Sequence, residues 1–262
     1  MVSYMDIKLI LKGFLVGVGK IIPGVSGSML AYSLGIYENI IDAVTDFFVN
    51  PKRNIKLLLN FGLGIFLAII FFSKLLIYLL NNYYIETMSL FLGLIIGTVI
   101  PFSKTLKFNK KNIFIFFITI IIFILITSNY SVKEFIYTGN LLNNVYIGLL
   151  GIIDAITSIV PGISGTAIFM MLGSYEFVLK ILSNPISIEF IIYGIGLIIG
   201  IIFICYVMNY LLKNKKDETN SLIFGLMVSS IFVLFISLSV KINLLTFLLF
   251  VLGIIIGYKF DK

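Results

Sequence analysis

The chain has few of the residues on which soluble enzymes depend. It contains no histidine and a single cysteine, Cys205, which lies inside an apolar run. These absences exclude acid–base catalysis and metal ligation by imidazole, a disulfide within the chain, and a thiolate metal site. We expect Cys205 to be a small buried hydrophobic residue. The sequence therefore predicts no catalytic residue, no metal site and no cofactor.

Charged residues are also scarce. They form 12% of the 262 residues, against about 25% in a typical soluble domain. Hydrophobic residues make up 60% of the chain. This composition excludes water-soluble enzymes, nucleic-acid-binding proteins and secreted disulfide-rich proteins, and it predicts an integral membrane protein. The net charge of +7 then concerns the side of the membrane on which the lysines lie, and no nucleic-acid partner is expected.

An internal repeat organises the chain. Residues 13–38 and 151–176 align at a constant offset of 138, and ten of the 26 positions are identical, including a PGxSG motif and a GxYE motif. Further along, an offset of 132 aligns FGLG at 61–64 with YGIG at 193–196. The sequence therefore predicts a single transmembrane domain over 1–262, built from two copies of one unit at about 7–126 and 146–260.

Each copy contains three apolar runs near the length of a membrane span, which is about 20 residues. The segments that open the copies, 7–22 and 146–160, are shorter; each stops at Pro-Gly and is followed by a second short apolar stretch. Because Pro-Gly breaks a helix and the following Ser is a good cap for the next one, each opening is predicted to be two half-helices that meet near the midplane. The predicted spans are about 57–80, 85–102, 112–128, 190–212, 221–240 and 242–258.

The basic residues predict the path of the two openings. If each opening enters the membrane and returns, 14 Lys and Arg lie on one side and 3 on the other, whereas a single crossing divides them 8 to 9. Only the re-entrant path obeys the positive-inside rule. The predicted fold is an all-α polytopic membrane protein with two inverted-topology repeats and both termini in the cytoplasm. Each repeat is a re-entrant helical hairpin followed by three transmembrane helices.

The two PGxSG tips are predicted to bind an anion such as phosphate. The first amides of a half-helix are unpaired donors with partial positive charge, glycines let a ligand approach the backbone, and hydroxyls add further donors. The alternative is that Pro-Gly only kinks a helix, and its presence in both copies disfavours that view. The predicted phosphate-binding residues are Lys20, Pro23, Gly24, Ser26, Gly27, Ser28, Pro161, Gly162, Ser164, Gly165 and Thr166.

Ionisable residues within the membrane are candidates for coupling or gating. Asp154 has Val16 at the equivalent position of the first copy, and it is expected either to pair with Lys20 or to take part in proton coupling. Glu38 and Glu176 follow the Gly-x-Tyr turns at the mouths of the two hairpins. They are predicted to gate a cavity or, alternatively, to be solvated carboxylates at the membrane interface.

The motifs PGVSGS with GIYE, and PGISGT with GSYE, make the chain resemble the bacterial family known as domain of unknown function 368, associated with PopT-type polyprenyl-phosphate transporters. The resemblance implies a bacterial cytoplasmic (inner) membrane protein that returns undecaprenyl phosphate from the outer to the inner leaflet for cell-wall synthesis. The chain departs from the family where Ser28 and Met29 replace a more usual Gly-Thr, and at Lys20, where Asn or Asp is more usual. By position, the family motif carries over to Pro23, Gly24, Ser26, Gly27, Pro161, Gly162, Ser164 and Gly165.

Three functions remain open. The leading prediction is a flippase that moves polyprenyl phosphate by alternating access, because one small polar centre in an apolar protein suits a substrate that is mostly hydrocarbon. A membrane lipid-pyrophosphate phosphatase would need an activated nucleophile or metal carboxylates, and the tips carry no acidic cluster. A transporter of a small soluble anion would use the same tips without the lipid chain. The expected partners are therefore a polyprenyl-phosphate lipid and the membrane; the oligomeric state is left open.

Overall fold

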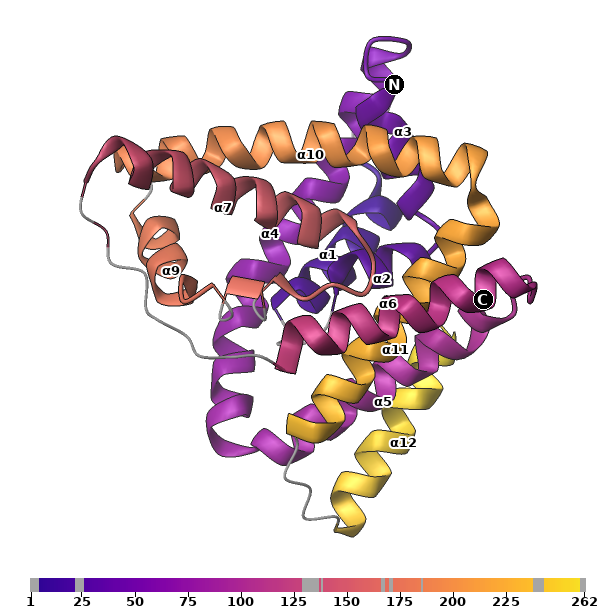
Figure 1. Ribbon diagram of the computed structural model, residues 1–262. Coiled ribbons are helices and arrows are strands. Elements are labelled where there is room, and N and C mark those ends of the chain that lie inside the picture. Colours follow the sequence, from indigo (N-terminus) through magenta and orange to yellow (C-terminus); the bar gives the residue numbers. More distant parts are fainter. Residues whose placement is uncertain are drawn as a thin grey trace.

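The computed structural model describes residues 5–21, 26–128, 137, 139–165, 168–169, 172–184, 186–237 and 243–259. Within these ranges all regular secondary structure is helical, so the predicted all-α class is confirmed (Figure 1). The helices are α1 (Ile7–Ile21), α2 (Gly27–Ser33), α3 (Tyr37–Thr45), α4 (Pro51–Asn82), α5 (Tyr84–Ser103), α6 (Lys110–Ser128), α7 (Leu141–Ile159), α9 (Tyr175–Ser183), α10 (Ile188–Asn214), α11 (Lys216–Ser237) and α12 (Leu244–Lys259).

The six predicted spans correspond to α4, α5, α6, α10, α11 and α12, although the last residues of the fifth run and the first of the sixth lie outside the described residues. Among the described residues, four helical segments are long and apolar enough to cross a membrane: Pro51–Phe72 within α4, and α5, α7 and α10. The presence of α7 corrects the expectation of a short half-helix over 146–160. It begins at Leu141 because the side chain of Asn140 accepts a hydrogen bond from the backbone N–H of Asn143.

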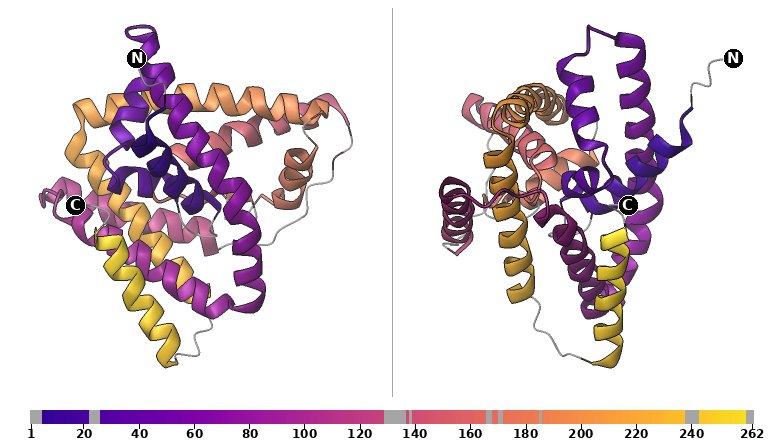
Figure 2. Two further views of the ribbon diagram at one scale, coloured as in Figure 1. Left: turned by 180° about the vertical axis from the view of Figure 1, so that it is seen from behind. Right: turned by 90° about the vertical axis from the view of Figure 1, so that its right-hand side faces the viewer.

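The helices of the two copies pack in matching pairs. In the first copy α1 packs along α4, and in the second copy the equivalent α7 packs along α10. The remaining long helices exchange partners between copies, since α5 packs on α12 and its equivalent α11 packs on α6. Both pairings are visible in Figures 1 and 2. Every one of these four interfaces therefore has a counterpart formed by the equivalent helices.

Small residues at equivalent positions make these interfaces close. On α4, the Cα of Gly64 faces the backbone of Ile10 and Phe14 in α1. On α10, the equivalent Gly196 faces the backbone of Gly148 in α7 in the same way. Small residues let helix backbones approach closely where burial of apolar surface gives no advantage over lipid. The repeat detected in the sequence is thus also a repeat of helix–helix contacts.

Replacing Gly64 by alanine is expected to lower the thermal stability of the purified protein. The new methyl group would overlap backbone atoms of α1, which cannot rotate away, and overpacking of this kind costs about 1–3 kcal/mol. Gly62 lies on the same helix with open space around it, so Gly62→Ala is the matched control and should not lower the melting temperature. Equal losses in both variants, measured by thermal unfolding in detergent, would contradict the close α1–α4 contact.

The two opening segments turn back on themselves within the molecule. After α2 the chain turns through Gly35 and continues into α3; the equivalent turn through Gly173 leads into α9, and both glycines have φ of 63°. Matching backbone bonds close these turns, from Ile36 to Ala31 at 3.1 Å and from Ser174 to Phe169 at 2.9 Å. Figure 1 shows α3 at the top of the view and α9 on its left side. The two openings therefore lead to helices on different sides of the molecule.

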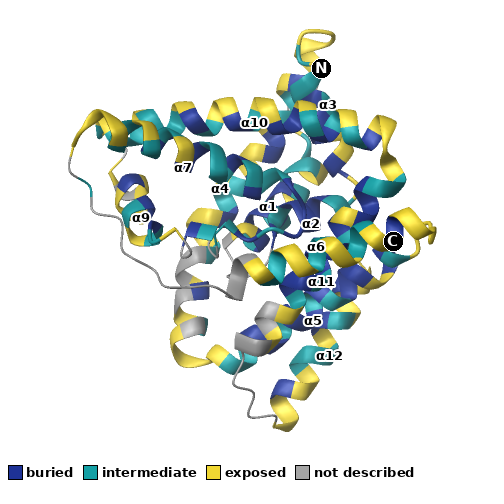
Figure 3. Ribbon diagram, viewed as in Figure 1, coloured by how far each residue is buried: buried dark blue, intermediate teal, exposed yellow. Residues whose placement is uncertain are grey.

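The buried core of the molecule surrounds the first hairpin. Met29 and Leu30 of α2 pack with Ile95 of α5, Cys205 of α10 and Met227 of α11, all buried. Figure 3 shows these buried segments near the labels of α1 and α2, while the outer faces of α6, α10 and α12 carry exposed residues. Many of those exposed side chains are large and apolar, as expected for surfaces that face lipid. The predicted burial of Cys205 is confirmed.

Candidate functional site

The ends of α1 and α7 meet at a cluster of polar side chains. Lys20 lies in the last turn of α1, and its ammonium Nζ donates a hydrogen bond of 2.9 Å to Oγ of Ser158 in the last turn of α7. The same Nζ is 4.0 Å from Oδ1 of Asp154, one turn earlier in α7. The pairing of Lys20 with Asp154, one of the two expectations for this carboxylate, is therefore confirmed.

The contact between Lys20 and Ser158 joins residues that are equivalent in the two copies, since they are separated by the repeat offset of 138. This contact therefore joins the two copies at matching positions of the repeat. The side chain of Lys20 is 45% exposed, so its charge is open to a ligand, whereas that of Asp154 is 16% exposed. This cluster is the strongest candidate for an anion site in the described part of the chain.

Tyr193 of α10 completes the cluster. Its hydroxyl donates a 2.8 Å hydrogen bond to Oδ2 of Asp154. In the first copy, the equivalent positions hold Phe61 and Val16, both buried, so the polar pair exists in one copy only. Sequence reasoning missed Tyr193 and Ser158. The repeat offset could have indicated Ser158, because it is the equivalent of Lys20, whereas nothing in the sequence pattern singles out Tyr193.

The first hairpin tip differs in two ways from the expected half-helix. Ser26 occupies the N-cap position of α2, but its hydroxyl lies 2.8 Å from that of Ser28 and does not cap a backbone N–H. Both serines are buried. Moreover, α2 has seven residues, so its dipole is weaker than that of the longer helix predicted. Lys20 therefore becomes the main positive charge near this tip. Gly27 is close to it, since a Cβ added there would lie 3.3 Å from Cβ of Lys20.

The second hairpin tip begins where α7 stops. Val160 is extended because Pro161 follows it, and Gly162 has φ of 88° and packs its backbone against Leu226 and Met227 of α11. The hydroxyl of Ser230 donates a hydrogen bond to the carbonyl of Gly162. A Cβ added to Gly165 would lie 3.7 Å from Oδ1 of Asp154, so this tip adjoins the polar cluster.

Two further bonds that the sequence did not suggest hold the hairpins in place, one between the hairpins and one within the first. Tyr37, from the first GxYE motif, donates a 2.9 Å hydrogen bond to the carbonyl of Ile159 at the end of α7. Lys12 of α1 donates a 2.7 Å bond to the carbonyl of Leu34, just after α2. Both bonds satisfy carbonyls at helix C-termini, which have no partner within their own helix. The first bond fixes the end of α7, next to Ser158 of the cluster, and the second fixes the end of α2 against α1.

The two glutamates predicted to act in gating lie at different surfaces. Glu38 of α3 pairs with Lys216 at 3.3 Å, and on the next turn Asp42 pairs with Lys213 at 3.4 Å. These side chains line a pocket of about 180 Å³ with Ile41, Asn209 and Leu212. Glu176, at the start of α9, is exposed. The structure thus places Glu38 in an ion-pair network and Glu176 at an open surface, and neither contacts the cluster around Lys20.

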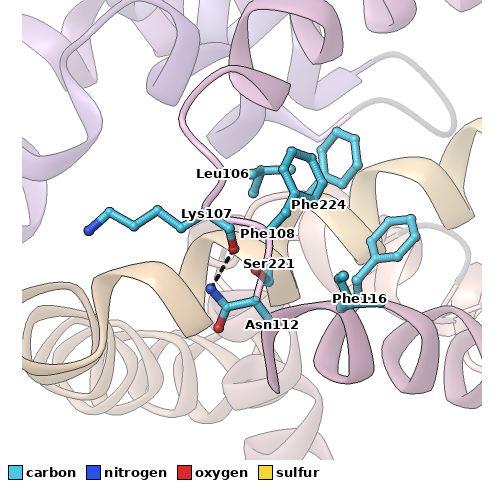
Figure 4. Close-up of a pocket in the computed structure, with 8 residues that line it drawn as sticks. Leu106, Lys107, Phe108, Asn112, Phe116, Ser221 and Phe224 are labelled. Atoms are coloured by element: carbon cyan, nitrogen blue, oxygen red, sulfur yellow. Dashed lines mark hydrogen bonds between the residues drawn. The ribbon is translucent and has the colours of Figure 1, made fainter. Parts of the chain in front are cut away.

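A second pocket, of about 50 Å³, lies between α6, α11 and the segment before α6 (Figure 4). Its walls are mostly apolar, with Phe116 and Phe224 facing it, and the amide of Asn112 donates a 2.8 Å bond to the carbonyl of Lys107. The ammonium of Lys107 extends away from the pocket and pairs with Asp217. The pocket contains none of the predicted site residues, and its size suits no phosphate-bearing lipid headgroup with its chain.

Some predictions lie outside the described residues. These are Pro23, Gly24 and Thr166 of the two tips, and nothing further is derived from them. Of the other predicted phosphate-binding residues, Lys20, Gly27 and Gly165 adjoin the cluster directly, and Gly162 packs on α11. Ser26, Ser28, Pro161 and Ser164 are buried at the two tips. Within the described ranges, no group of three or more His, Cys, Asp or Glu could hold a metal ion.

Known proteins are similar to the chain over most of its length. The sequence profile of the undecaprenyl phosphate translocase-like family matches residues 16–245. A polyprenyl-phosphate transporter of Vibrio cholerae serotype O1 is 28% identical, over 84% of this chain and 75% of the relative. A polyprenyl-phosphate transporter of Staphylococcus aureus is 30% identical, over 97% of this chain and 95% of the relative. No solved structure matches the chain significantly.

Proposed function

The chain belongs to the undecaprenyl phosphate translocase-like family, and on this basis we propose that it transports polyprenyl phosphate, with undecaprenyl phosphate as the substrate. The single observation that carries the site is the meeting of Lys20 with Ser158 and Asp154 between the two hairpins. A cation with hydroxyl donors suits a phosphate headgroup. The exposed apolar faces of the long helices leave the hydrocarbon chain in lipid while the headgroup moves. In this role the chain is a transporter and not an enzyme.

We further propose that the two copies are inverted-topology repeats in the bacterial cytoplasmic membrane, with both termini in the cytoplasm. The matching helix pairs, α1 with α4 and α7 with α10, support two copies of one unit over about 7–126 and 146–260. The placement of α3 and α9 on different sides of the molecule supports re-entrant segments that enter from opposite sides. Binding where discontinuous helices of inverted repeats meet is common in secondary transporters.

Alternating access is the proposed mechanism, and Glu38 belongs to its gate. On one side, α3 is tied to the C-terminal half of α10 by the ion pair of Asp42 with Lys213 and by bonds from Tyr206 and Asn209 to Thr45. The ion pair of Glu38 with Lys216 ties it to the start of α11. The equivalent partners on the other side are α9 and α4, and their described residues have no comparable packing. Such asymmetry supports a molecule closed at α3 and open at α9, with Glu176 at the open mouth. If α3 opened and α9 closed, the phosphate would be presented to the opposite leaflet.

Removing the hydroxyls of both tips tests the site. Ser26→Ala with Ser164→Ala is expected to lower transport of undecaprenyl phosphate in proteoliposomes roughly tenfold, because each lost hydrogen bond to a charged group weakens binding. The matched control is Ser89→Ala with Ser221→Ala. These serines are also buried and equivalent in the two copies, but each bonds a carbonyl of its own helix. If transport falls equally in both double variants, the tips do not bind the phosphate.

Two further measurements separate the alternative functions. If inorganic phosphate competes as strongly as the lipid, the protein is a transporter of a small soluble anion. If the purified protein releases phosphate from undecaprenyl pyrophosphate, it is a phosphatase. For the proposed transporter we expect weak competition by inorganic phosphate and no phosphate release.

A further inference from the structure

The carboxylate of Asp154 has two oxygens with different partners. Oδ2 accepts the 2.8 Å bond from Tyr193, while the contacts of Oδ1 with described residues are longer, 3.4 Å from Oγ of Ser158 and 4.0 Å from Nζ of Lys20. The better bond therefore holds Asp154 to α10, and the contact with Lys20 is the one that breaks more easily. Lys20 and Asp154 lie on different copies, so this contact also crosses the boundary between the two halves.

We propose that Asp154 is a resident counter-ion that the phosphate displaces from Lys20, and that Tyr193 is the positioning residue that holds Asp154 once it is displaced. The inference rests on the proposed transport of polyprenyl phosphate, and it assigns a function to Tyr193, for which sequence reasoning had none. In the empty site the carboxylate neutralises a lysine that would otherwise be an uncompensated charge within the membrane. In the loaded site the phosphate takes that role.

The charges require this exchange. A lysine and a carboxylate together are neutral, so a phosphate that joined both would place two anionic groups beside one cation. Like charges at such a separation repel, especially where water is scarce. The hydroxyl of Ser158 can donate its proton to either the carboxylate or the phosphate, because its oxygen accepts from Lys20 at 2.9 Å and lies within reach of Oδ1 of Asp154. Tyr193 donates only to the far oxygen, so its bond persists when Oδ1 withdraws.

The exchange limits how tightly the phosphate binds. A transported group has to bind well enough to enter the site and weakly enough to leave it. Competition from Asp154 lowers the affinity of Lys20 for phosphate, and it provides a partner for Lys20 when the phosphate departs. The first copy has Val16 and Phe61 at the equivalent positions, so the described site contains one such competitor. Removal of the carboxylate should therefore strengthen binding and slow turnover.

Three variants test the proposal through binding and transport together. Binding is measured as the lipid concentration that gives half-maximal thermal stabilisation in detergent, with undecaprenyl phosphate as the probe and undecaprenol as the uncharged control. Asp154→Asn is expected to lower this concentration about fivefold, the effect of removing one partly exposed competing charge, and to slow transport in proteoliposomes. Tyr193→Phe should raise the lipid concentration needed for half-maximal stabilisation, because a carboxylate that Tyr193 no longer holds moves closer to Lys20. Phe61 already occupies the equivalent position in the first copy, so the ring itself fits.

The double variant Asp154→Asn with Tyr193→Phe separates positioning from structure. If Tyr193 acts through the carboxylate, the double variant binds as Asp154→Asn does, whereas a purely structural tyrosine would weaken binding in both backgrounds. Asp217→Asn is the matched control, because it also removes the carboxylate of a Lys–Asp pair, at 3.0 Å, but away from the hairpins.

The outcomes distinguish this inference from the function on which it rests. If the unmodified protein responds equally to undecaprenyl phosphate and undecaprenol, the proposed function itself is wrong. If it prefers the phosphate, but Asp154→Asn binds it no more tightly than the unmodified protein does, Asp154 is not a competitor and the counter-ion proposal is overturned. Tighter binding in Asp154→Asn, weaker binding in Tyr193→Phe, and no effect in Asp217→Asn are the results that support it.

Discussion

Lys20→Gln is expected to lower undecaprenyl phosphate transport in proteoliposomes by at least about tenfold. The variant removes the positive charge that meets Ser158 and Asp154 at the junction of the hairpins. Hydrogen bonds to charged groups contribute about 1.5–3 kcal/mol, and 1.4 kcal/mol corresponds to a tenfold change in affinity. The short α2 contributes little dipole to replace the lost charge. Glutamine keeps a similar length and a donor, so the loss reports the charge itself.

Lys107→Gln is the control for this variant. Lys107 also pairs with an aspartate, at 3.0 Å, but its side chain is 73% exposed and extends away from the neighbouring pocket (Figure 4). We expect its transport to remain near that of the unmodified protein. Binding of undecaprenol should be unchanged in both variants, because neither lysine recognises the hydrocarbon. Undiminished transport by Lys20→Gln would remove Lys20 from the phosphate site.

Gly162→Ala is expected to be the most destabilising single-methyl change at either tip. Its φ of 88° is unfavourable for alanine by about 1–2 kcal/mol. The added Cβ would also lie 2.8 Å from Cβ of Leu226 and from the backbone N of Met227, which adds an overpacking cost of about 1–3 kcal/mol. We expect a fall of at least about 5 °C in the melting temperature of the purified protein. Transport should fall as well, because this turn positions the second tip.

Gly194→Ala provides the comparison. Gly194 lies within α10 with open space around the added methyl group, and alanine is a better helix former than glycine. This variant should melt at the same temperature as the unmodified protein or slightly above it. A melting temperature of Gly162→Ala within one degree of that of Gly194→Ala would contradict the close packing of the second tip on α11.

The sequence predicted the long helices well because their signal is local. Apolar runs of span length, such as the one in α10, depend on composition alone, and the structure contains a helix at each of the six. The errors fall at the ends of the helices that open the two copies. α7 begins earlier than predicted because Asn140 caps it, and α2 is shorter because the turn at Gly35 ends it. These ends depend on side-chain bonds and turns, which hydropathy does not report.

The site was predictable only in part, for a related reason. The repeated motifs indicated Lys20 and Asp154, because a charge in an apolar run stands out. Tyr193 did not stand out, since a tyrosine in such a run is unremarkable until its hydroxyl is seen on Asp154, 39 residues away in the chain. Likewise, Ser26 was expected to cap a backbone amide, but the neighbouring Ser28 offers its hydroxyl a closer partner. Tertiary contacts select among local options that are equally plausible in sequence.

The hydrogen bond between Lys20 and Ser158 also bears on stoichiometry. The proposed inverted repeat relates the two halves by a twofold axis, and under that symmetry a contact between equivalent residues lies on the axis and occurs only once. Two lysines at such a point would repel each other, so the two copies have to differ there, as Lys and Ser do. Although the sequence is repeated, the residues at this contact are not. Titration of one chain with undecaprenyl phosphate should therefore saturate at a single bound lipid.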